Sequence, residues 1–201
     1  MSMPIRSRLA HGLACIALAL AGACVSNTPR IATHRSAVVL SASEQQVSEA
    51  FEAQVKDYMA LHRKLAATLP KLSKNATAQE IDTNQRALGD LVKNARANAA
   101  RGEFFTPQLQ ALVKRTLAAV LAGPDGANTR GSILDENPGV ANLNVNDRYP
   151  DSIPLSTMPP QVLESLPELA DDLEYRFIGE RLTLMDPSAH IIIDFTDDVL
   201  P

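Results

Sequence analysis

The stretch that decides the fold is residues 173–195, with the sequence LEYRFIGERLTLMDPSAHIIIDF. Apolar and polar side chains alternate in three short runs within it, which is the period of a half-buried β-strand. Turn sequences separate the runs, so the pattern predicts a three-stranded antiparallel meander with one apolar face. That face must be buried, most simply on helices. The runs are Leu173–Ile178, Leu182–Leu184 and Ile191–Phe195, and the turns are Gly179-Glu180 and Asp186-Pro187-Ser188.

Three helices are expected before this sheet, over about residues 44–122. The first is predicted to begin near Ser43, whose hydroxyl can cap the backbone while Gln46 completes a capping box. Pro70 is expected to end it. Its apolar residues recur at spacings of three, four and seven, which predicts one buried face. They are Val47, Phe51, Val55, Tyr58, Leu65 and Leu69.

The second and third helices have their own boundary residues. Thr77 and Glu80 form a capping box for the second helix, and Gly102 is its expected C-cap. Thr106 is expected to cap the third helix, with Pro107 at the first position, where a missing N–H costs nothing. With the sheet, these helices predict an α+β fold, an N-terminal three-helix bundle packed on a small C-terminal antiparallel β-meander.

From Gly123-Pro124 onward, prolines and turn sequences replace the helical pattern. We therefore expect a turn-rich and β part over about 124–196. Ser132–Glu136 and Pro160–Leu166 are each expected to add a short helical turn. Apolar residues alternate with asparagine over Leu143–Val145, which predicts a short exposed strand.

The N-terminus has the features of a secretory signal peptide. Arg6 and Arg8 form a positive segment, Leu9–Leu20 is almost entirely apolar, and Ala21-Gly22-Ala23 are small. The apolar core has roughly a dozen residues, fewer than the about 20 that a spanning helix needs. Export is therefore expected. The predicted organisation is a signal peptide at 1–23, a tether at 24–43 and a single domain at 44–201.

Cys24 follows the small residues and resembles the lipidated cysteine of a bacterial lipobox. Ala21 occupies the position where that motif usually has leucine, and Leu20 lies one place earlier. Cys15 lies inside the signal peptide, so Cys24 would be a lone thiol in an oxidising compartment. We expect Cys24 to be lipidated and to attach the chain to the outer membrane, because Val25 is not the aspartate that favours inner-membrane retention. A soluble periplasmic protein is the alternative.

Composition and motifs argue against several classes of function. The net charge is −4, or −6 without the two arginines of the signal peptide, so the basic excess of a nucleic-acid binder is missing. Aromatic residues are 4% of the chain, which leaves few faces for stacking on bases or sugars. The sequence has no phosphate-binding glycine loop, G-x-S-x-G, C-x-x-C or H-E-x-x-H motif. We expect a non-enzymatic protein with no cofactor and no nucleic-acid partner.

Few residues are candidates for metal binding. A structural or solvated role is expected for His62 on the first helix, because metal ligands rarely come singly. His190 and Asp194, with Asp197 and Asp198, could supply ligands. His190 and Asp194 would lie about 13 Å apart on an extended strand, too far for one ion. We therefore expect a solvent-facing row and a polar end here, and no metal site.

Other charged residues are expected to be solvated. Asp171-Asp172 precede the first strand, where they can cap or turn the chain, and no partner acid suggests a catalytic pair. Cationic residues on the second and third helices are expected to form a solvated face, with contact to anionic lipid as a secondary role. They include Lys93, Arg96, Lys114 and Arg115.

The run Met158-Pro159-Pro160-Gln161-Val162-Leu163, then Leu166-Pro167, then Leu173–Asp186 resembles a motif of uncharacterised exported proteins of Gram-negative bacteria. Its layout is similar to the hairpin of the RcnB-like periplasmic family, which is associated with nickel and cobalt homeostasis. The shared features are a proline-rich lead-in, Tyr-Arg-x-x-Gly, an apolar strand, an aspartate and an Ile-rich last strand. The resemblance covers about the last fifth of the chain. It implies metal handling, but this chain lacks the abundant histidines of that function.

These observations predict a non-enzymatic cell-envelope lipoprotein whose domain binds another envelope component. The first alternative is a periplasmic metal-homeostasis or stress protein of the RcnB-like kind. The second is an enzyme of unknown class.

Overall fold

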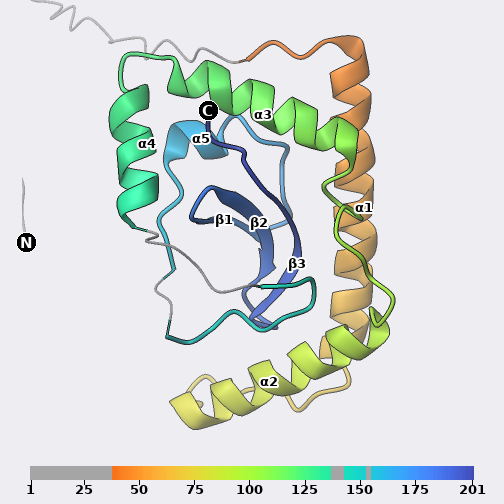
Figure 1. Cartoon of the computed structure of the whole chain (residues 1–201). Coiled ribbons are helices and arrows are strands. Elements are labelled where there is room, and N and C mark those ends of the chain that lie inside the picture. Colours follow the sequence, from red (N-terminus) through yellow and green to blue (C-terminus); the bar gives the residue numbers. More distant parts are fainter. Residues whose placement is uncertain (1–37, 137–142, 153–154) are drawn as a thin grey trace, which may run out of the picture. The chain divides into compact units, whose positions relative to one another are not determined.

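The computed structural model of the chain describes residues 38–136, 143–152 and 155–201. Within these ranges the chain has the predicted α+β fold, with packed helices and a C-terminal antiparallel sheet (Figure 1). The predicted signal peptide at 1–23, Cys24 and the tether up to residue 37 lie outside the described residues. The elements are α1 (Ala42–Ala66), α2 (Ala78–Ala95), α3 (Pro107–Leu121), α4 (Gly126–Asp135), α5 (Pro160–Leu163), β1 (Glu174–Ile178), β2 (Arg181–Asp186) and β3 (Ile191–Thr196).

The N-terminus of α1 is fixed by a capping box, but the predicted box at Ser43 is wrong. Glu44 N–H donates to Ser41 Oγ (3.3 Å), and Ser41 N–H donates to Glu44 Oε2 (2.8 Å). Both Ser41-x-x-Glu44 and Ser43-x-x-Gln46 have the required spacing. The Glu44 box forms because a negative charge is favoured at the positive end of the helix dipole. α1 therefore begins at Ala42, within the predicted tether.

The predicted starts of α2 and α3 are confirmed. Glu80 N–H donates to Thr77 Oγ1 (3.2 Å), and Thr77 N–H donates to Glu80 Oε2 (2.7 Å). Leu109 N–H donates to Thr106 Oγ1 (3.3 Å), with Pro107 at the first helical position. Each start depends on residues three positions apart, which is why the sequence alone identifies it.

Two helices end earlier than predicted. α1 ends at Ala66 rather than at Pro70, and α2 ends at Ala95 rather than near Gly102. Gly102 instead lies in the link between α2 and α3, with a φ of +87° that side-chain-bearing residues rarely adopt. The glycine therefore serves the turn of this link and is not the C-cap of α2.

α4 is longer than the helical turn predicted at Ser132–Glu136, because it begins at Gly126. A Cβ atom at Gly126 would lie 1.8 Å from the carbonyl oxygen of Leu121, so this glycine lets α4 start directly behind α3. α5 is a single turn at the start of the predicted segment 160–166. None of the helices in the described part is long and apolar enough to cross a membrane.

The three-stranded meander is confirmed, with strand order β1-β2-β3 and antiparallel pairing throughout. Tyr175 pairs with Leu184, and Leu184 pairs with Asp194, with a register shift after Leu184. Gly179 has a φ of +61° at the first position of the two-residue turn between β1 and β2. Glycine at that position is typical of a type II′ hairpin turn.

Both faces of the sheet are buried, whereas the alternating pattern predicted one buried face. All residues of β3 are buried. One face joins the main core, where Phe51 of α1 stacks on Tyr175 of β1 with 6.3 Å between ring centroids. The other face forms a smaller apolar cluster. Its buried members are Leu143, Tyr149, Ile178, Met185, Ile192 and Phe195.

Residues 143–149 run along the outer edge of β3, and the exposed strand predicted at Leu143–Val145 is wrong. Leu143 is buried, and Asn146 adopts a φ of +66° in a turn. Asn146 N–H donates to Ile192 O (2.8 Å), and Ile192 N–H donates to Asp147 O (2.9 Å). The segment thus covers the edge of β3 that would otherwise be open to pairing.

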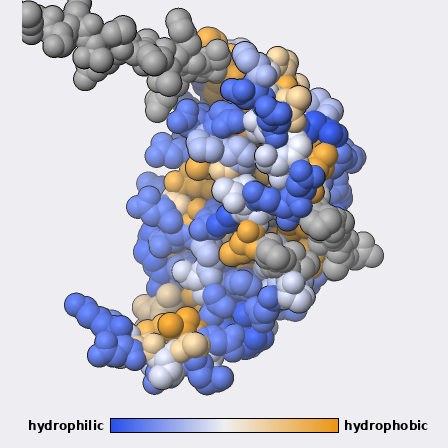
Figure 2. Space-filling model, turned by 90° about the vertical axis from the view of Figure 1, so that its left-hand side faces the viewer, coloured by the Kyte–Doolittle hydropathy of each residue, from blue (hydrophilic) through white to orange (hydrophobic). Residues whose placement is uncertain are grey.

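The helices border the sheet and share its main core. α1 packs on both α2 and α3, and α3 also contacts α4 and α5. Figure 1 shows the four longer helices on successive sides of the sheet. On the face in Figure 2, hydrophilic residues dominate and hydrophobic residues appear in separate patches. The large apolar residues exposed in the described part are Val39, Leu72, Ile81, Leu155 and Leu163.

Candidate functional site

Asp186, the last residue of β2, is a buried carboxylate that holds α1 against the sheet. Its side chain is inaccessible to solvent. Tyr58 Oη and His62 Nδ1, both from α1, each donate to Asp186 Oδ2 at 2.6 Å. Ala189 N–H donates to Asp186 Oδ1 at 2.8 Å. These three donors supply the hydrogen bonds that a buried carboxylate requires.

His62 is buried, so of its two predicted roles the structure supports the structural one. Nδ1 carries a proton because the Asp186 carboxylate only accepts. The hydrogen bond to Asp186 raises the pKa of His62, although partial burial opposes the rise. Burial, and then the Asp186 charge, raise the pKa of Tyr58. The His62 side chain is only 8% exposed, so this group has little access to a substrate.

The raised pKa of His62 makes stability depend on pH. Because the pKa is higher in the folded chain, the stabilisation is fully present below the unfolded value of about 6.5 and is lost as pH rises through the folded value. We expect the difference in unfolding free energy between the wild type and His62→Asn to shrink as pH rises above about 6.5. Urea titrations across this range measure that difference.

His190→Asn is the matched control for this experiment. Burial lowers the pKa of His190, and Arg148 nearby adds to the effect. The contribution of His190 is therefore present above about pH 6.5 and lost as pH falls, which is the opposite sign. A pH-independent difference for His62→Asn would contradict the assignment of a protonated, Asp186-bonded imidazole.

Asp194, predicted to face solvent, is completely buried in β3. Its Oδ2 accepts from the backbone N–H groups of Phe104 (2.8 Å) and Phe105 (2.9 Å). Its Oδ1 accepts from Gly102 N–H (3.0 Å). The prediction of a solvent-facing row is wrong because β3 is covered on both faces. Asp194 instead fixes the link between α2 and α3 onto the sheet.

Arg96, predicted to lie on a solvated helix face, is also buried. It is the C-cap of α2, so helical periodicity no longer sets its direction. Its guanidinium donates to Asn146 Oδ1 (2.9 Å), Glu103 Oε2 (2.9 Å) and Ile193 O (3.1 Å). It also lies 5.5 Å from the ring centroid of Tyr58. Arg96 thus ties α2 to the sheet and to the segment covering β3.

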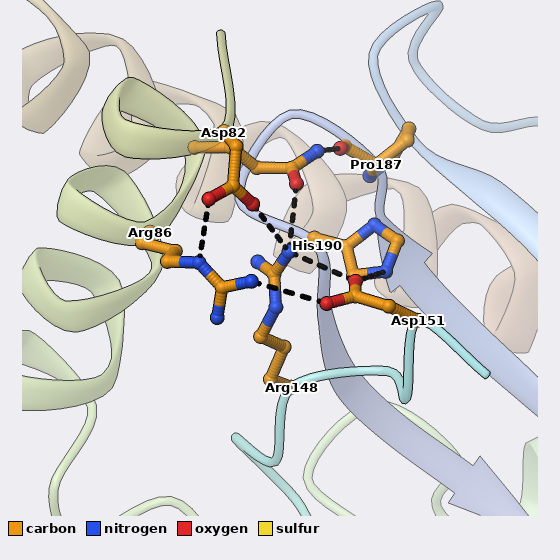
Figure 3. Close-up of polar contacts among 7 residues, drawn as sticks. Asp82, Arg86, Arg148, Asp151, Pro187 and His190 are labelled. Atoms are coloured by element: carbon orange, nitrogen blue, oxygen red, sulfur yellow. Dashed lines mark hydrogen bonds and ion pairs between the residues drawn. The ribbon is translucent and has the colours of Figure 1, made fainter. Parts of the chain in front are cut away.

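A polar cluster joins α2 to the loop around residue 150 (Figure 3). Arg148 donates to Asp151 Oδ1 (3.0 Å) and Gln85 Oε1 (3.1 Å). Arg86 bridges the two segments, donating to Asp82 Oδ2 (2.8 Å) and Asp151 Oδ2 (3.1 Å). The Arg86 and Asp151 side chains are about half exposed, so each ion pair contributes little to stability. This cluster is a network at the surface of the described part of the chain.

His190 lies at one side of this cluster (Figure 3). It has a φ of +55° in the turn before β3. Its Nε2 is 3.4 Å from Asp151 Oδ1, and Gln85 in the same cluster donates to Pro187 O (2.9 Å). His190 thus belongs to the surface network, while Asp194 belongs to the buried link described above.

The remaining residues singled out by the sequence lie at or near the surface. Asp197 pairs with Arg181 at 2.6 Å. Among the described residues, no group of three His, Cys, Asp or Glu side chains could hold a metal ion. The exposed residues of this set are Lys93, Lys114, Arg115, Asp171, Asp172 and Asp198.

A cavity of about 620 Å³ lies beside β1. Its walls come from α5 with the segment that follows it, and from the start of β1. This volume is within the range of about 300–1,000 Å³ that is typical of ligand pockets. The main apolar lining residues are Met158, Leu163, Leu166, Leu169, Leu173 and Tyr175.

The charged residues of this cavity are mostly acidic. Glu164, Glu168, Asp171 and Glu174 line it, with Arg176 as the one cation among the lining residues. Arg176 donates to Glu174, so this pair is neutral. Glu168 and Asp171 are exposed and form no ion pair within the described ranges. We call these two residues the acidic rim.

A smaller cavity of about 260 Å³ adjoins the first. The two share Glu168 and Ala170, and the smaller one is also lined by Lys56 and Arg63 of α1. Sequence reasoning missed both cavities, because the segment 164–172 shows no helical or strand periodicity. The acidic residues and Pro167 after α5 are the one visible sign of an irregular segment beside the sheet.

Comparisons with protein-family models, with curated proteins and with solved structures found no match to this chain. The resemblance to the RcnB-like family therefore stays a prediction.

Proposed function

We propose that this chain is a non-enzymatic lipoprotein of the outer membrane, attached through Cys24, whose domain binds a segment of another envelope component in the cavity beside β1. The observation that carries the proposal is this cavity, with its apolar walls and acidic rim. Apolar walls with a few charged groups are typical of binding sites, because burial supplies affinity and charge supplies orientation.

Tyrosine and histidine side chains with raised pKa values are held by hydrogen bonds within the chain, which supports binding rather than catalysis. Tyr58 and His62 have raised pKa values, but their hydrogen bonds are to the buried Asp186. None of these three residues lines the cavity. Tyr175 does line it, and burial raises the pKa of Tyr175, but its Oη donates to Pro167 O (3.1 Å) within the chain. The cavity therefore offers apolar contact and carboxylates to a bound segment, which suits recognition of a partner.

Photo-crosslinking in the native host tests the proposal. A photoreactive amino acid replaces Leu163, which lines the cavity and is 48% exposed. We expect one discrete crosslinked partner, identified by mass spectrometry as the same segment of the same envelope protein in independent cultures. The matched control is the same substitution at Leu72, which is 45% exposed and lies on the link between α1 and α2.

Identical products from the two positions, or no product from Leu163, would contradict a binding role for the cavity.

The intact mass of the uncrosslinked chain from the membrane fraction serves as the control for attachment. A chain beginning at acylated Cys24 supports the lipoprotein. An unmodified chain in the soluble periplasmic fraction would remove the membrane anchor from the proposal.

A further inference from the structure

Within the described residues β1 is an edge strand, since it pairs with β2 on one side only. Ile178 and Arg181 flank the two-residue turn and therefore form a hydrogen-bonded pair. The alternation of an antiparallel ladder then directs the backbone N–H and C=O groups of Tyr175 and Phe177 away from β2. This outer edge borders the cavity, which β1 lines with Tyr175 and its two neighbours.

The outer edge of β1 is only partly covered. Phe177 C=O accepts from Ser156 Oγ at 3.0 Å. For the backbone N–H and C=O of Tyr175, no hydrogen bond to a segment outside the sheet occurs within the described ranges. The opposite edge of the sheet differs, because Asn146 and Asp147 bond to Ile192 there. A backbone donor and acceptor without partners at a cavity wall favour an added strand, which would satisfy both.

The acidic rim indicates the charge of the added segment. Glu168 and Asp171 are exposed, and the neutral pair of Glu174 and Arg176 does not offset them. Lys56 and Arg63 line the adjoining smaller cavity with Glu168, but within the described ranges neither forms an ion pair with it. A partner segment with a lysine or arginine beside its apolar residue would pair with this rim. An acidic segment would be repelled, so the rim selects between partners as well as attracting one.

We infer that the partner is an extended peptide segment, apolar at its centre and flanked by basic residues, that adds as a strand to the outer edge of β1 at Tyr175. Its backbone bonds to Tyr175, one apolar side chain enters the cavity, and a flanking cation meets Glu168 or Asp171. This inference rests on the proposed function, because it states the conformation and charge of the segment that the cavity binds.

The test uses the full chain and the peptide Lys-Leu-Val-Leu-Lys-amide with fluorescein on its N-terminal nitrogen, with fluorescence anisotropy as the readout. The peptide is N-methylated in turn at each of its backbone nitrogens. We expect saturable binding that weakens about tenfold on methylation at one position, since one backbone hydrogen bond to a buried acceptor is lost. Replacing both peptide lysines by glutamate is expected to weaken binding about tenfold as well.

Variants of the chain give the complementary test. Glu168→Lys combined with Asp171→Lys is expected to reverse the preference, so that the glutamate peptide binds more tightly than the lysine peptide. Asp90→Lys, a charge reversal at an exposed site on α2, is the control and is expected to leave the preference unchanged. On peptide binding, hydrogen exchange at the Tyr175 amide is expected to slow at least about tenfold.

Four outcomes overturn the inference. Equal affinity for all methylated peptides means that the peptide fills the cavity without joining the sheet. Absence of saturable binding would contradict the inference that a basic peptide adds as a strand. A preference of the wild-type chain for the glutamate peptide would contradict it as well. Dimerisation of the chain through β1 would make a second copy the occupant. In each case, a discrete partner crosslinked from Leu163 would still support the proposed function. Failure of this inference can therefore be distinguished from failure of the proposed function.

Discussion

Asp186→Ala is expected to lower the free energy of unfolding by about 4 kcal/mol. The substitution removes the acceptor of Tyr58 Oη, His62 Nδ1 and Ala189 N–H at a site without solvent. Each donor left without a partner costs about 1–3 kcal/mol of stability. The cost at His62 is smaller, because its imidazole can lose the proton on Nδ1. Urea denaturation followed by circular dichroism measures the loss.

Asp90→Ala serves as the control for this substitution, because Asp90 is exposed on α2. It is expected to change stability by no more than about 0.5 kcal/mol. Asp186→Asn keeps the shape of the side chain and one acceptor, so an intermediate loss is expected. A loss below about 1 kcal/mol for Asp186→Ala would show that the carboxylate does not hold α1 against the sheet.

Asp194→Ala is expected to cost a similar amount, about 3–5 kcal/mol. Its carboxylate accepts from three backbone N–H groups of the link between α2 and α3, and backbone donors cannot move to other acceptors without unfolding the link. The local effect is expected at Gly102, Phe104 and Phe105, whose amides should exchange with solvent much faster. Hydrogen exchange followed by mass spectrometry of this segment measures it.

Asp135→Ala, at the exposed end of α4, is the control for Asp194→Ala. Removing an acid from a helix C-terminus is neutral or slightly stabilising. If Asp194→Ala accelerates exchange equally in α4 and in the link, the effect is global. The local role of Asp194 would then be contradicted, even with the expected loss of stability.

Local patterns predicted the helices and strands well. Thr77 with Glu80, and Thr106 with Pro107, fix helix starts through residues that are three positions apart or adjacent. Gly179 fixes the hairpin turn in the same way. The error at Ser43 has the same origin, because two overlapping capping boxes were possible and the spacing could not distinguish Glu44 from Gln46.

Burial of polar residues could not be predicted, because it depends on contacts between distant parts of the chain. Asp194 has the alternation of a solvent-facing strand position, and only the packing on both faces of β3 buries it. Arg96 follows the periodicity of a solvated helix face until α2 ends at the preceding residue. Asp186 was recognised only as part of a turn, since nothing near it in the sequence reveals Tyr58 and His62.

The candidate binding site was beyond sequence reasoning for a related reason. The cavity is formed by an irregular segment, in which Leu166 and Leu169 line a wall without helical or strand periodicity. The contacts of residues in such a segment are determined by the three-dimensional path of the chain and not by a local sequence pattern. The open edge of β1 is different, because a meander always leaves two outer edges, and the sequence does not say which of them is covered.

The two buried carboxylates also determine when the domain can form during synthesis. Asp186 follows Tyr58 by 128 residues, and Asp194 follows Phe104 by 90 residues. The ribosome produces the N-terminal part first, so α1 and the link after α2 emerge long before their acceptors exist. Stable folding therefore waits until β3 has been translated. For a polypeptide exported as proposed, this delay would keep the chain unfolded and competent for threading through a translocation channel.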